Sequence, residues 1–244
     1  MLSRLLEIAY PPVCEGCGDA YYKNGIPGIC QTCIDEKLFP QVEPFCDVCG
    51  QSYRGYMANQ QCSNCRGRHL SFDFAVGAYR AEGEIMDWIH RFKYVHEIHF
   101  ARTFGQLMTR VWEDSRLSHF DDWTVVPVPL HRKRLRERGF NQSFEIAREW
   151  VRHSPKNKQL RIVNALKRNQ YTTRQATLDR KERLSNLKGA FAPAKHMADK
   201  LKDAENIIIV DDVLTTGTTA SECASILRET LSPNRISVIT VLRG

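Results

Sequence analysis

The sequence has no apolar run that approaches the roughly 20 residues a helix needs to span a bilayer. Its opening residues, MLSRLLEIAYPP, hold an apolar stretch too short for the core of a secretory signal. We therefore expect a cytoplasmic protein with no membrane span. With 42% hydrophobic and 26% charged residues, the chain is neither fibrous nor disordered, and 244 residues suffice for one or two domains.

Cysteine is almost absent after residue 65, where only Cys223 remains. Disulfides are rare in the cytosol, so the other eight cysteines need a different explanation. They form four Cys-x-x-Cys pairs, each starting 16 residues after the previous one. The pairs are Cys14 and Cys17, Cys30 and Cys33, Cys46 and Cys49, and Cys62 and Cys65.

Two facing Cys-x-x-Cys turns build the four-sulfur tetrahedron of a closed structural zinc site. A 32-residue repeat relates Cys14-x-x-Cys17-Gly18 to Cys46-x-x-Cys49-Gly50. The repeat favours sequential pairing, with the first two pairs on one ion and the last two on the other. The spacing alone leaves interleaved pairing and an iron–sulfur cluster open. We predict two structural zinc ions in a double zinc-ribbon domain over residues 1–68.

From residue 69 to 244, segments typical of strands and helices alternate. This alternation predicts an α/β domain with a mostly parallel sheet. The run at 207–210 is apolar without alternation, as in a strand that is buried on both faces. The predicted strands are 74–79, 125–128, 207–210 and 236–242, and the predicted helices are 85–92, 100–112, 144–151 and 218–231.

The stretch 207–219 reads IIIVDDVLTTGTT, in which a buried strand runs into two carboxylates, then a Thr/Gly turn and a helix. Ligands of parallel sheets bind outside the carboxyl ends of the strands, and a helix N-terminus suits a phosphate. The two carboxylates can accept hydrogen bonds from sugar hydroxyls. This stretch therefore predicts a site for a sugar and its phosphate, whereas the plain alternative is a capped helix after a buried strand.

A second segment, PVPLHRKRLRERGFNQ at 127–142, follows the predicted strand at 125–128. We expect it to form a basic loop at the same end of the sheet. Guanidinium groups match pyrophosphate oxygens with two parallel hydrogen bonds, although a solvated basic loop would look the same in sequence. The candidate ligands for pyrophosphate or DNA are His131, Arg132, Lys133, Arg134, Arg136, Arg138 and Asn141.

Positive charge is concentrated in the region 131–183, which holds 16 Lys and Arg against 5 Asp and Glu. The rest of the chain has 19 basic and 23 acidic residues, so the positive net charge of +7 comes entirely from the region 131–183. Such a patch favours polyanionic partners, namely phosphates or nucleic acid. Phe140 and Tyr171 lie among these cations, where they could stack on unpaired bases.

The run at 207–219 resembles the signature of type I phosphoribosyltransferases, which bind phosphoribosyl pyrophosphate with magnesium. The resemblance implies that Asp211 and Asp212 bind the ribose hydroxyls and that Thr215 to Thr219 surround the 5′-phosphate. The implied ligand-binding residues are Asp211, Asp212, Val213, Leu214, Thr215, Thr216, Gly217, Thr218 and Thr219.

Nearly the whole chain is similar to the ComF family of competence-associated phosphoribosyltransferase-like proteins, of the ComFC type. The resemblance rests on the cysteine pairs, on the segments at 127–142 and 207–219, and on Arg174, Gln175, Leu178, Arg183, Asn186 and Phe191. It implies a zinc module followed by a type I phosphoribosyltransferase fold. It also implies a role with incoming single-stranded DNA in natural transformation, alongside a competence helicase and a recombination mediator.

Three classes of function remain open: a DNA-handling protein with a phosphoribosyl pyrophosphate site, an active transferase, and an adaptor whose zinc module docks a helicase. The transferase would move phosphoribosyl to a nitrogenous base and release pyrophosphate. No residue stands out as its general base, and the catalytic residues stay unknown. His96 and His99 lack a third ligand and predict no metal site, and Cys223 is expected to be a small buried hydrophobe.

Overall fold

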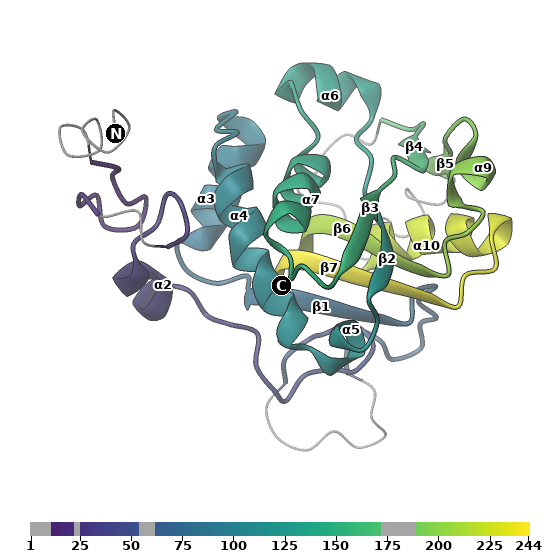
Figure 1. Cartoon of the computed structure of the whole chain (residues 1–244), viewed down its shortest axis with the longest axis horizontal. Helices are drawn as coiled ribbons and strands as arrows, with labels where there is room; N and C mark the ends of the chain where they lie inside the picture. Colours follow the sequence, from purple (N-terminus) through teal and green to yellow (C-terminus); the bar gives the residue numbers. More distant parts are fainter. Residues whose placement is uncertain (1–10, 22–24, 54–61, 172–188) are drawn as a thin grey trace.

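The computed structural model, which describes residues 11–21, 25–53, 62–171 and 189–244, is built on a five-stranded sheet. All of its strand pairs are parallel, in the order β1-β7-β6-β2-β3 (Figure 1). The strands are β1 (Phe74–Arg80), β2 (Asp122–Pro127), β3 (Gln159–Ile162), β6 (Asn206–Leu214) and β7 (Arg235–Arg243). The central strands β6 and β7 are buried on both faces, which explains the unbroken apolar run of β6 at 207–210.

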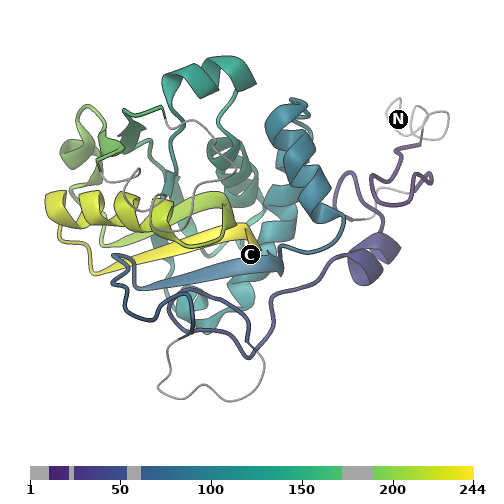
Figure 2. The ribbon, with the colours of Figure 1, turned by 180° about the vertical axis from the view of Figure 1, so that it is seen from behind.

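Helices cover both faces of the sheet, and this confirms the predicted α/β fold (Figures 1 and 2). Ile208 and Val210 join one apolar cluster while Ile207 and Ile209 join the other, because successive strand residues point to opposite faces. Over the first cluster lie α3 (Ile85–Tyr94), α4 (Phe100–Leu107), the 3-10 helix η2 (Met108–Glu113), α5 (Ser115–Ser118) and α7 (Gln142–His153). Over the second lie α9 (Met197–Leu201) and α10 (Thr218–Thr230).

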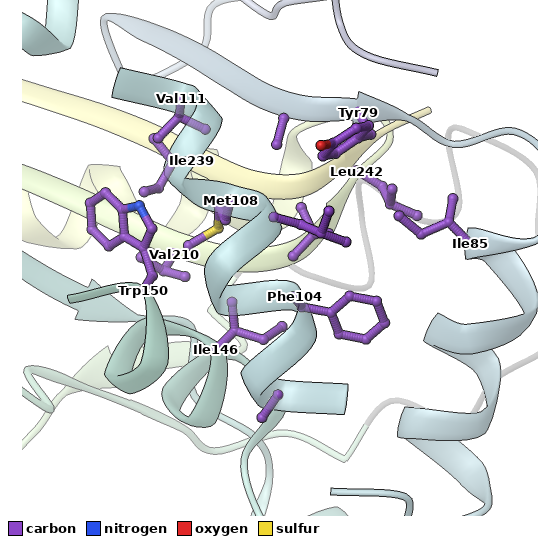
Figure 3. Packing of buried hydrophobic residues seen from close by; sticks show 14 of the residues in the cluster. Tyr79, Ile85, Phe104, Met108, Val111, Ile146, Trp150, Val210, Ile239 and Leu242 are labelled. Carbon is purple, nitrogen blue, oxygen red and sulfur yellow. The ribbon is translucent and has the colours of Figure 1, made fainter. Parts of the chain in front are cut away.

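The first cluster is centred on α4, whose side chains pack between α7 and the sheet (Figure 3). A Cβ at Gly105 would lie 2.5 Å from the Cβ of Glu149, so only glycine allows α4 and α7 to cross this closely. The predicted helix at 100–112 is instead α4 followed by η2. Residues three apart align in a 3-10 helix, which brings both Met108 and Val111 into the core.

The basic segment after β2 was predicted to be a loop, and this is wrong: it forms α6 (Arg132–Arg138). His131 begins the helix by accepting a hydrogen bond from the backbone N–H of Lys133, and Gly139 ends it with a left-handed φ of 77°. Arg, Lys and Leu are strong helix formers, so a capped run of them is helical even though α6 has no buried residue.

Two short strands, β4 (Leu166–Arg168) and β5 (Phe191–Pro193), pair antiparallel beside the main sheet. Phe191 is buried there. The other residues of the downstream pattern, namely Arg174, Gln175, Leu178, Arg183 and Asn186, lie outside the described residues. Among the helices that the structure describes, none is both long and apolar enough to cross a membrane.

The described part of the N-terminal region has little regular structure apart from α2 (Gln31–Lys37). It meets the sheet domain in two places. Cys14 and Cys33 belong to the apolar cluster under α4, whereas Cys46, Cys49, Cys62 and Cys65 all belong to the cluster on the opposite face. These six cysteines are thus part of the core of the α/β domain as well as of their own turns.

Candidate functional site

The eight N-terminal cysteines form two groups of four, in sequential order along the chain. Within each group the sulfur atoms all lie within 4.8 Å of one another. Zn–S bonds of about 2.3 Å in a tetrahedron place the sulfurs about 3.8 Å apart, so both groups fit a zinc ion. The first group is Cys14, Cys17, Cys30 and Cys33, and the second is Cys46, Cys49, Cys62 and Cys65. The favoured sequential arrangement is the one the structure adopts.

The two groups differ in their surroundings. Cys17 is exposed and Cys30 is half-buried, whereas all four cysteines of the second group are buried. Burial raises the pKa of Cys14, but backbone N–H donors of Cys30 and Cys17 outweigh it and bring the pKa to about 7. In the second group burial likewise raises the pKa of Cys49, but the side chains of Asn64 and Arg243 lower it to about 6. Each group therefore contains a thiol that readily becomes the thiolate a metal requires.

The first ribbon docks on α3 and α4 through polar contacts. Arg91 of α3 pairs with Glu15 at 2.8 Å and with Glu97 at 2.6 Å, and the Thr103 hydroxyl donates to the carbonyl of Pro27 at 2.6 Å. His99 lies 3.2 Å from Glu15 as well. Because Arg91 binds both carboxylates, this group is an ion-pair network that joins the ribbon to the helices.

The acidic pair lies within β6 and not in the turn after it, which corrects the expected end of that strand. Backbone pairing with β7 continues past the carboxylates, with Asp211 opposite Thr240 and Leu214 opposite Arg243. The pair therefore lies on regular strand backbone at the carboxyl end of β6. The two adjacent carboxylates have different partners, Ser143 of α7 for Asp211 and Lys93 of α3 for Asp212.

Asp212 is 6% exposed and forms a 2.7 Å ion pair with Lys93 of α3. Asp211 accepts hydrogen bonds from the Ser143 hydroxyl at 2.8 Å and from the backbone N–H of Asp212 at 3.0 Å. Burial, followed by the negative charge of Asp212, raises the pKa of Asp211 to about 6, although Lys93 and Ser143 oppose the rise. At neutral pH the site thus contains two carboxylates and one ammonium group.

The turn after β6 leads directly into α10. Thr215 is exposed, and Gly217 has a φ of 76°, a left-handed conformation that favours glycine. Thr218 begins the helix, and its hydroxyl lies 3.0 Å from that of Thr216. The first N–H groups of a helix have no partner within the helix, and its dipole is positive at this end. This turn, residues 215–219, has the geometry to receive a phosphate and is called the phosphate loop below.

Two arginine side chains hold the phosphate loop in place through hydrogen bonds. Arg243 donates to the carbonyls of Leu214 at 2.9 Å and Thr215 at 2.8 Å. Arg68, which follows the second zinc group, donates to the carbonyl of Thr216 at 2.8 Å and to the hydroxyl of Thr218 at 3.2 Å. The conformation of the loop therefore depends on residues that are remote in sequence.

The basic segment lies at the same end of the sheet as the acidic pair. The amide of Asn141 caps α7 and donates to the carbonyl of Val128 at 3.1 Å, so both ends of this side chain are engaged within the protein. Burial and the neighbouring Arg134 lower the pKa of Arg168, while the carboxylate of Asp211 raises it. The cations of α6, β4 and the acidic pair thus belong to one electrostatic neighbourhood.

The aromatic side chains near α6 contact its cations. The Lys133 ammonium lies 4.5 Å from the centre of the Tyr171 ring, and the His131 ring meets Tyr171 edge-on at 5.4 Å. The Arg138 guanidinium lies 5.0 Å from the centre of the Tyr94 ring. Phe140, in contrast, packs against the apolar core, with its ring centre 5.2 Å from that of Phe92. Arg132, Lys133 and Arg136 are exposed, and α6 lies at the outer edge of the molecule (Figure 1).

Four residues of this region were missed by the sequence reasoning: Lys93, Ser143, Arg68 and Arg243. Ser143 lies two residues after Asn141 at the start of a helix that follows a strand, a position that could have suggested it. Lys93 also lies on a helix that follows a strand end. Arg68 and Arg243 carry no comparable signal, because their contacts depend on how the second ribbon packs.

The chain was compared with known protein families and proteins. A double zinc ribbon domain matches residues 5–66. Competence protein F from Haemophilus influenzae is 31% identical over 214 residues, which cover 85% of this chain and 86% of that protein. Competence protein ComFC from Bacillus subtilis is 26% identical over 88% of this chain and 84% of its own. DNA utilization protein YhgH from Escherichia coli is 30% identical over 61% of this chain and 56% of its own.

The first two of these similarities cover 85% and 88% of this chain, so they concern most of its architecture. The two four-cysteine groups agree with the zinc ribbon match, and the parallel sheet agrees with the expected fold. On the strength of its likeness to Competence protein F along most of both chains, this protein belongs to the ComF family.

Proposed function

We propose that this protein acts in DNA uptake during natural competence, where it handles single-stranded DNA and binds phosphoribosyl pyrophosphate with Mg²⁺. The observation that carries the proposal is the juxtaposition of an acidic pair, a phosphate loop and a basic helix at one end of a parallel sheet. Ligands of open α/β sheets bind at this end. The names of the relatives, which refer to competence and to DNA utilization, support the same role.

Each part of the phosphoribosyl ligand has a counterpart in the site. Asp211 and Asp212 would accept hydrogen bonds from the ribose hydroxyls, and the N-terminus of α10 with Thr215 to Thr219 would hold the 5′-phosphate. Mg²⁺ binds oxygen ligands and keeps several waters, so it can arrive on the pyrophosphate and needs no dedicated protein cage. Arg134 and Arg138 of α6, which influence Arg168 electrostatically as Asp211 does, are candidates for the pyrophosphate itself.

Single-stranded DNA would bind to the outer side of the same region. Exposed cations of α6 would contact the phosphates, and Tyr171 would stack on a base. A cytoplasmic location, a helicase and a recombination mediator as partners are part of the same proposal and rest on the family resemblance. The two four-cysteine groups would hold structural zinc, since neither leaves a ligand position open.

The test is a calorimetric titration of Mg²⁺ and phosphoribosyl pyrophosphate into the full-length zinc-loaded protein, repeated with the protein saturated with single-stranded DNA. We expect the ligand to bind, and we expect DNA to weaken its binding because both occupy the same cationic region. The matched variant is Asp211→Asn with Asp212→Asn, which should abolish ligand binding and leave DNA binding intact. If neither ligand nor DNA binds at low salt, the proposed function is wrong.

A further inference from the structure

The phosphate loop is connected to the second zinc group by one side chain, that of Arg243. On one side its guanidinium donates to the carbonyls of Leu214 and Thr215. On the other side it donates to the carbonyl of Cys49 at 2.6 Å, to the Cys49 sulfur at 3.3 Å and to the Gln51 side chain at 3.1 Å. The Arg243 guanidinium thus connects the zinc ligand Cys49 to the start of the phosphate loop.

A second connection runs through Arg68. It donates to the carbonyl of Thr216 and to the hydroxyl of Thr218, and it is held by the side chain of Asn64 at 2.9 Å. Asn64 lies between Cys62 and Cys65, so its position is fixed by the same group of cysteines. Together with Arg243, Arg68 supplies hydrogen bonds to three consecutive carbonyls, those of residues 214–216.

The environment of Arg243 requires a nearby negative charge. Arg243 is only 3% exposed, and a buried guanidinium is costly unless it is paired. Four thiolates around Zn²⁺ carry a net negative charge, which the Cys49 sulfur presents to the guanidinium. The metal fixes the position of Cys49, and with it the positions of the carbonyl and the sulfur that accept hydrogen bonds from Arg243. The backbone also makes room for the side chain, because a Cβ at Gly77 would lie 2.6 Å from the Cβ of Arg243.

We propose that the zinc ion of the second group sets the conformation of the phosphate loop and that Arg243 is the positioning residue through which it does so. The two zinc ions then have different roles. The first ribbon is fastened to α3 and α4 by Arg91 and Thr103 and would hold no part of the loop. The consequence for ligand binding rests on the proposed function, whereas the consequence for loop order does not.

A pair of matched zinc variants tests the proposal. Cys30→Ser and Cys62→Ser each remove one ligand, from the first and the second group respectively. In the full-length protein each should lose about one zinc ion. Amide hydrogen exchange of residues 215–219 should accelerate about tenfold or more in Cys62→Ser and stay unchanged in Cys30→Ser. Equal exchange of the loop in both variants would overturn the proposal.

Variants of Arg243 keep the test decisive if Cys62→Ser does not fold. Arg243→Met should retain both zinc ions but accelerate exchange of the loop and weaken binding of Mg²⁺ with phosphoribosyl pyrophosphate about tenfold. Arg243→Lys should restore part of the slow exchange of the loop and part of the ligand affinity. Its ammonium group keeps the positive charge but lacks the forked donors of a guanidinium. If the loop in Arg243→Met exchanges as slowly as in the wild-type protein, the proposal is wrong. If the wild-type protein binds no ligand, the proposed function fails, and the exchange data still decide the positioning role.

Discussion

Asp211 and Asp212 illustrate how the position of a residue in a strand sets its charge state. The Asp212 carboxylate has the ammonium of Lys93 at 2.7 Å, whereas the Asp211 carboxylate has a hydroxyl and a backbone N–H. The pKa of Asp211 is therefore raised to about 6 by burial and by its charged neighbour. Asp212 is the residue with a full counterion, and Asp211 is the residue whose ionisation responds to mildly acidic pH.

Asp211→Asn should stabilise the ligand-free protein at pH 8. The pKa of Asp211 is about 6 in the folded protein against 3.8 as the ordinary value, so the folded state binds the proton more tightly. The ionised carboxylate then costs stability above pH 6, and this cost fades as the pH falls toward 3.8. Replacing the charge should raise the free energy of unfolding by about 1–3 kcal/mol at pH 8 and by less at pH 5, as measured by urea unfolding.

The control for this prediction is Asp203→Asn, which removes an exposed carboxylate and should change the stability little at either pH. A carbon-13 titration of the Asp211 carboxyl group gives an independent reading. Its midpoint should lie near pH 6 and move upward in Ser143→Ala, because the hydroxyl that favours the carboxylate is lost. The interpretation is wrong if Asp211→Asn destabilises the protein equally at pH 8 and pH 5.

The sequence predicted the residues that form local motifs and missed the residues that complete them. The cysteine groups follow from spacing, and the acidic pair follows from the run at 207–219. Lys93 lies far from Asp212 in the sequence, and only the packing of α3 against the sheet brings it within 2.7 Å. A long-range contact of this kind has no signature in a single sequence.

At the scale of elements, α6 is the feature that differs most from expectation. As a helix rather than a loop, it presents cations on a fixed surface, with Arg132 and Arg136 exposed one turn apart. Tyr171 lies against the same helix through Lys133. A rigid row of cations beside an aromatic ring matches the needs of a single strand, which offers phosphates and unstacked bases.

Substitutions on α6 should weaken DNA binding in two distinguishable ways. Arg136→Ala removes a phosphate contact, so it should lower affinity for every sequence and reduce the slope of log K against log salt by about 0.7. Tyr171→Ala removes stacking, so it should cost about 1–3 kcal/mol and leave the salt slope unchanged. Fluorescence anisotropy with labelled oligonucleotides at several salt concentrations measures both quantities.

The matched control is Arg102→Ala, which removes an exposed cation from α4 instead. It should change neither the affinity nor the salt slope. If Arg102→Ala and Arg136→Ala have equal effects, the binding follows total charge rather than α6. If Tyr171→Ala changes the slope, the ring acts through the cations that it positions and not through stacking.

Most elements were predictable because apolar periodicity reports burial, and burial is what the strands and the larger helices share. The predictions were wrong where forces other than apolar burial determine the structure. α6 buries nothing, so its caps and its helix-forming residues determine it. β6 continues through the carboxylates because backbone pairing with β7 outweighs the polarity of the side chains. The split of 100–112 into α4 and η2 depends on packing against α7.

At the scale of the whole molecule, the two zinc groups are attached in different ways. The first has an exposed cysteine, joins one apolar cluster through Cys14 and Cys33 and makes polar contacts to α3 and α4, whereas all four cysteines of the second are buried in the other cluster. The sequence predicted one zinc module over residues 1–68. Within the described part of this region, the two cysteine groups pack toward opposite faces of the sheet. The two groups should therefore differ in how their loss affects the fold.

A chelator should remove the two zinc ions in separate steps with different consequences. The ion of the first group should leave first, because Cys17 is exposed, and the near-UV circular dichroism of the buried tryptophans should be largely retained. Loss of the second ion frees four cysteines that are buried in an apolar cluster, and it disrupts the hydrogen bonds that hold the buried Arg243 guanidinium at Cys49. Domains are stable by only about 5–15 kcal/mol, so this step should coincide with unfolding.

The order of events is checked by measuring zinc release with a colorimetric indicator while circular dichroism is recorded in parallel. Release of both ions without loss of the near-UV signal would show that the second group is not part of the core.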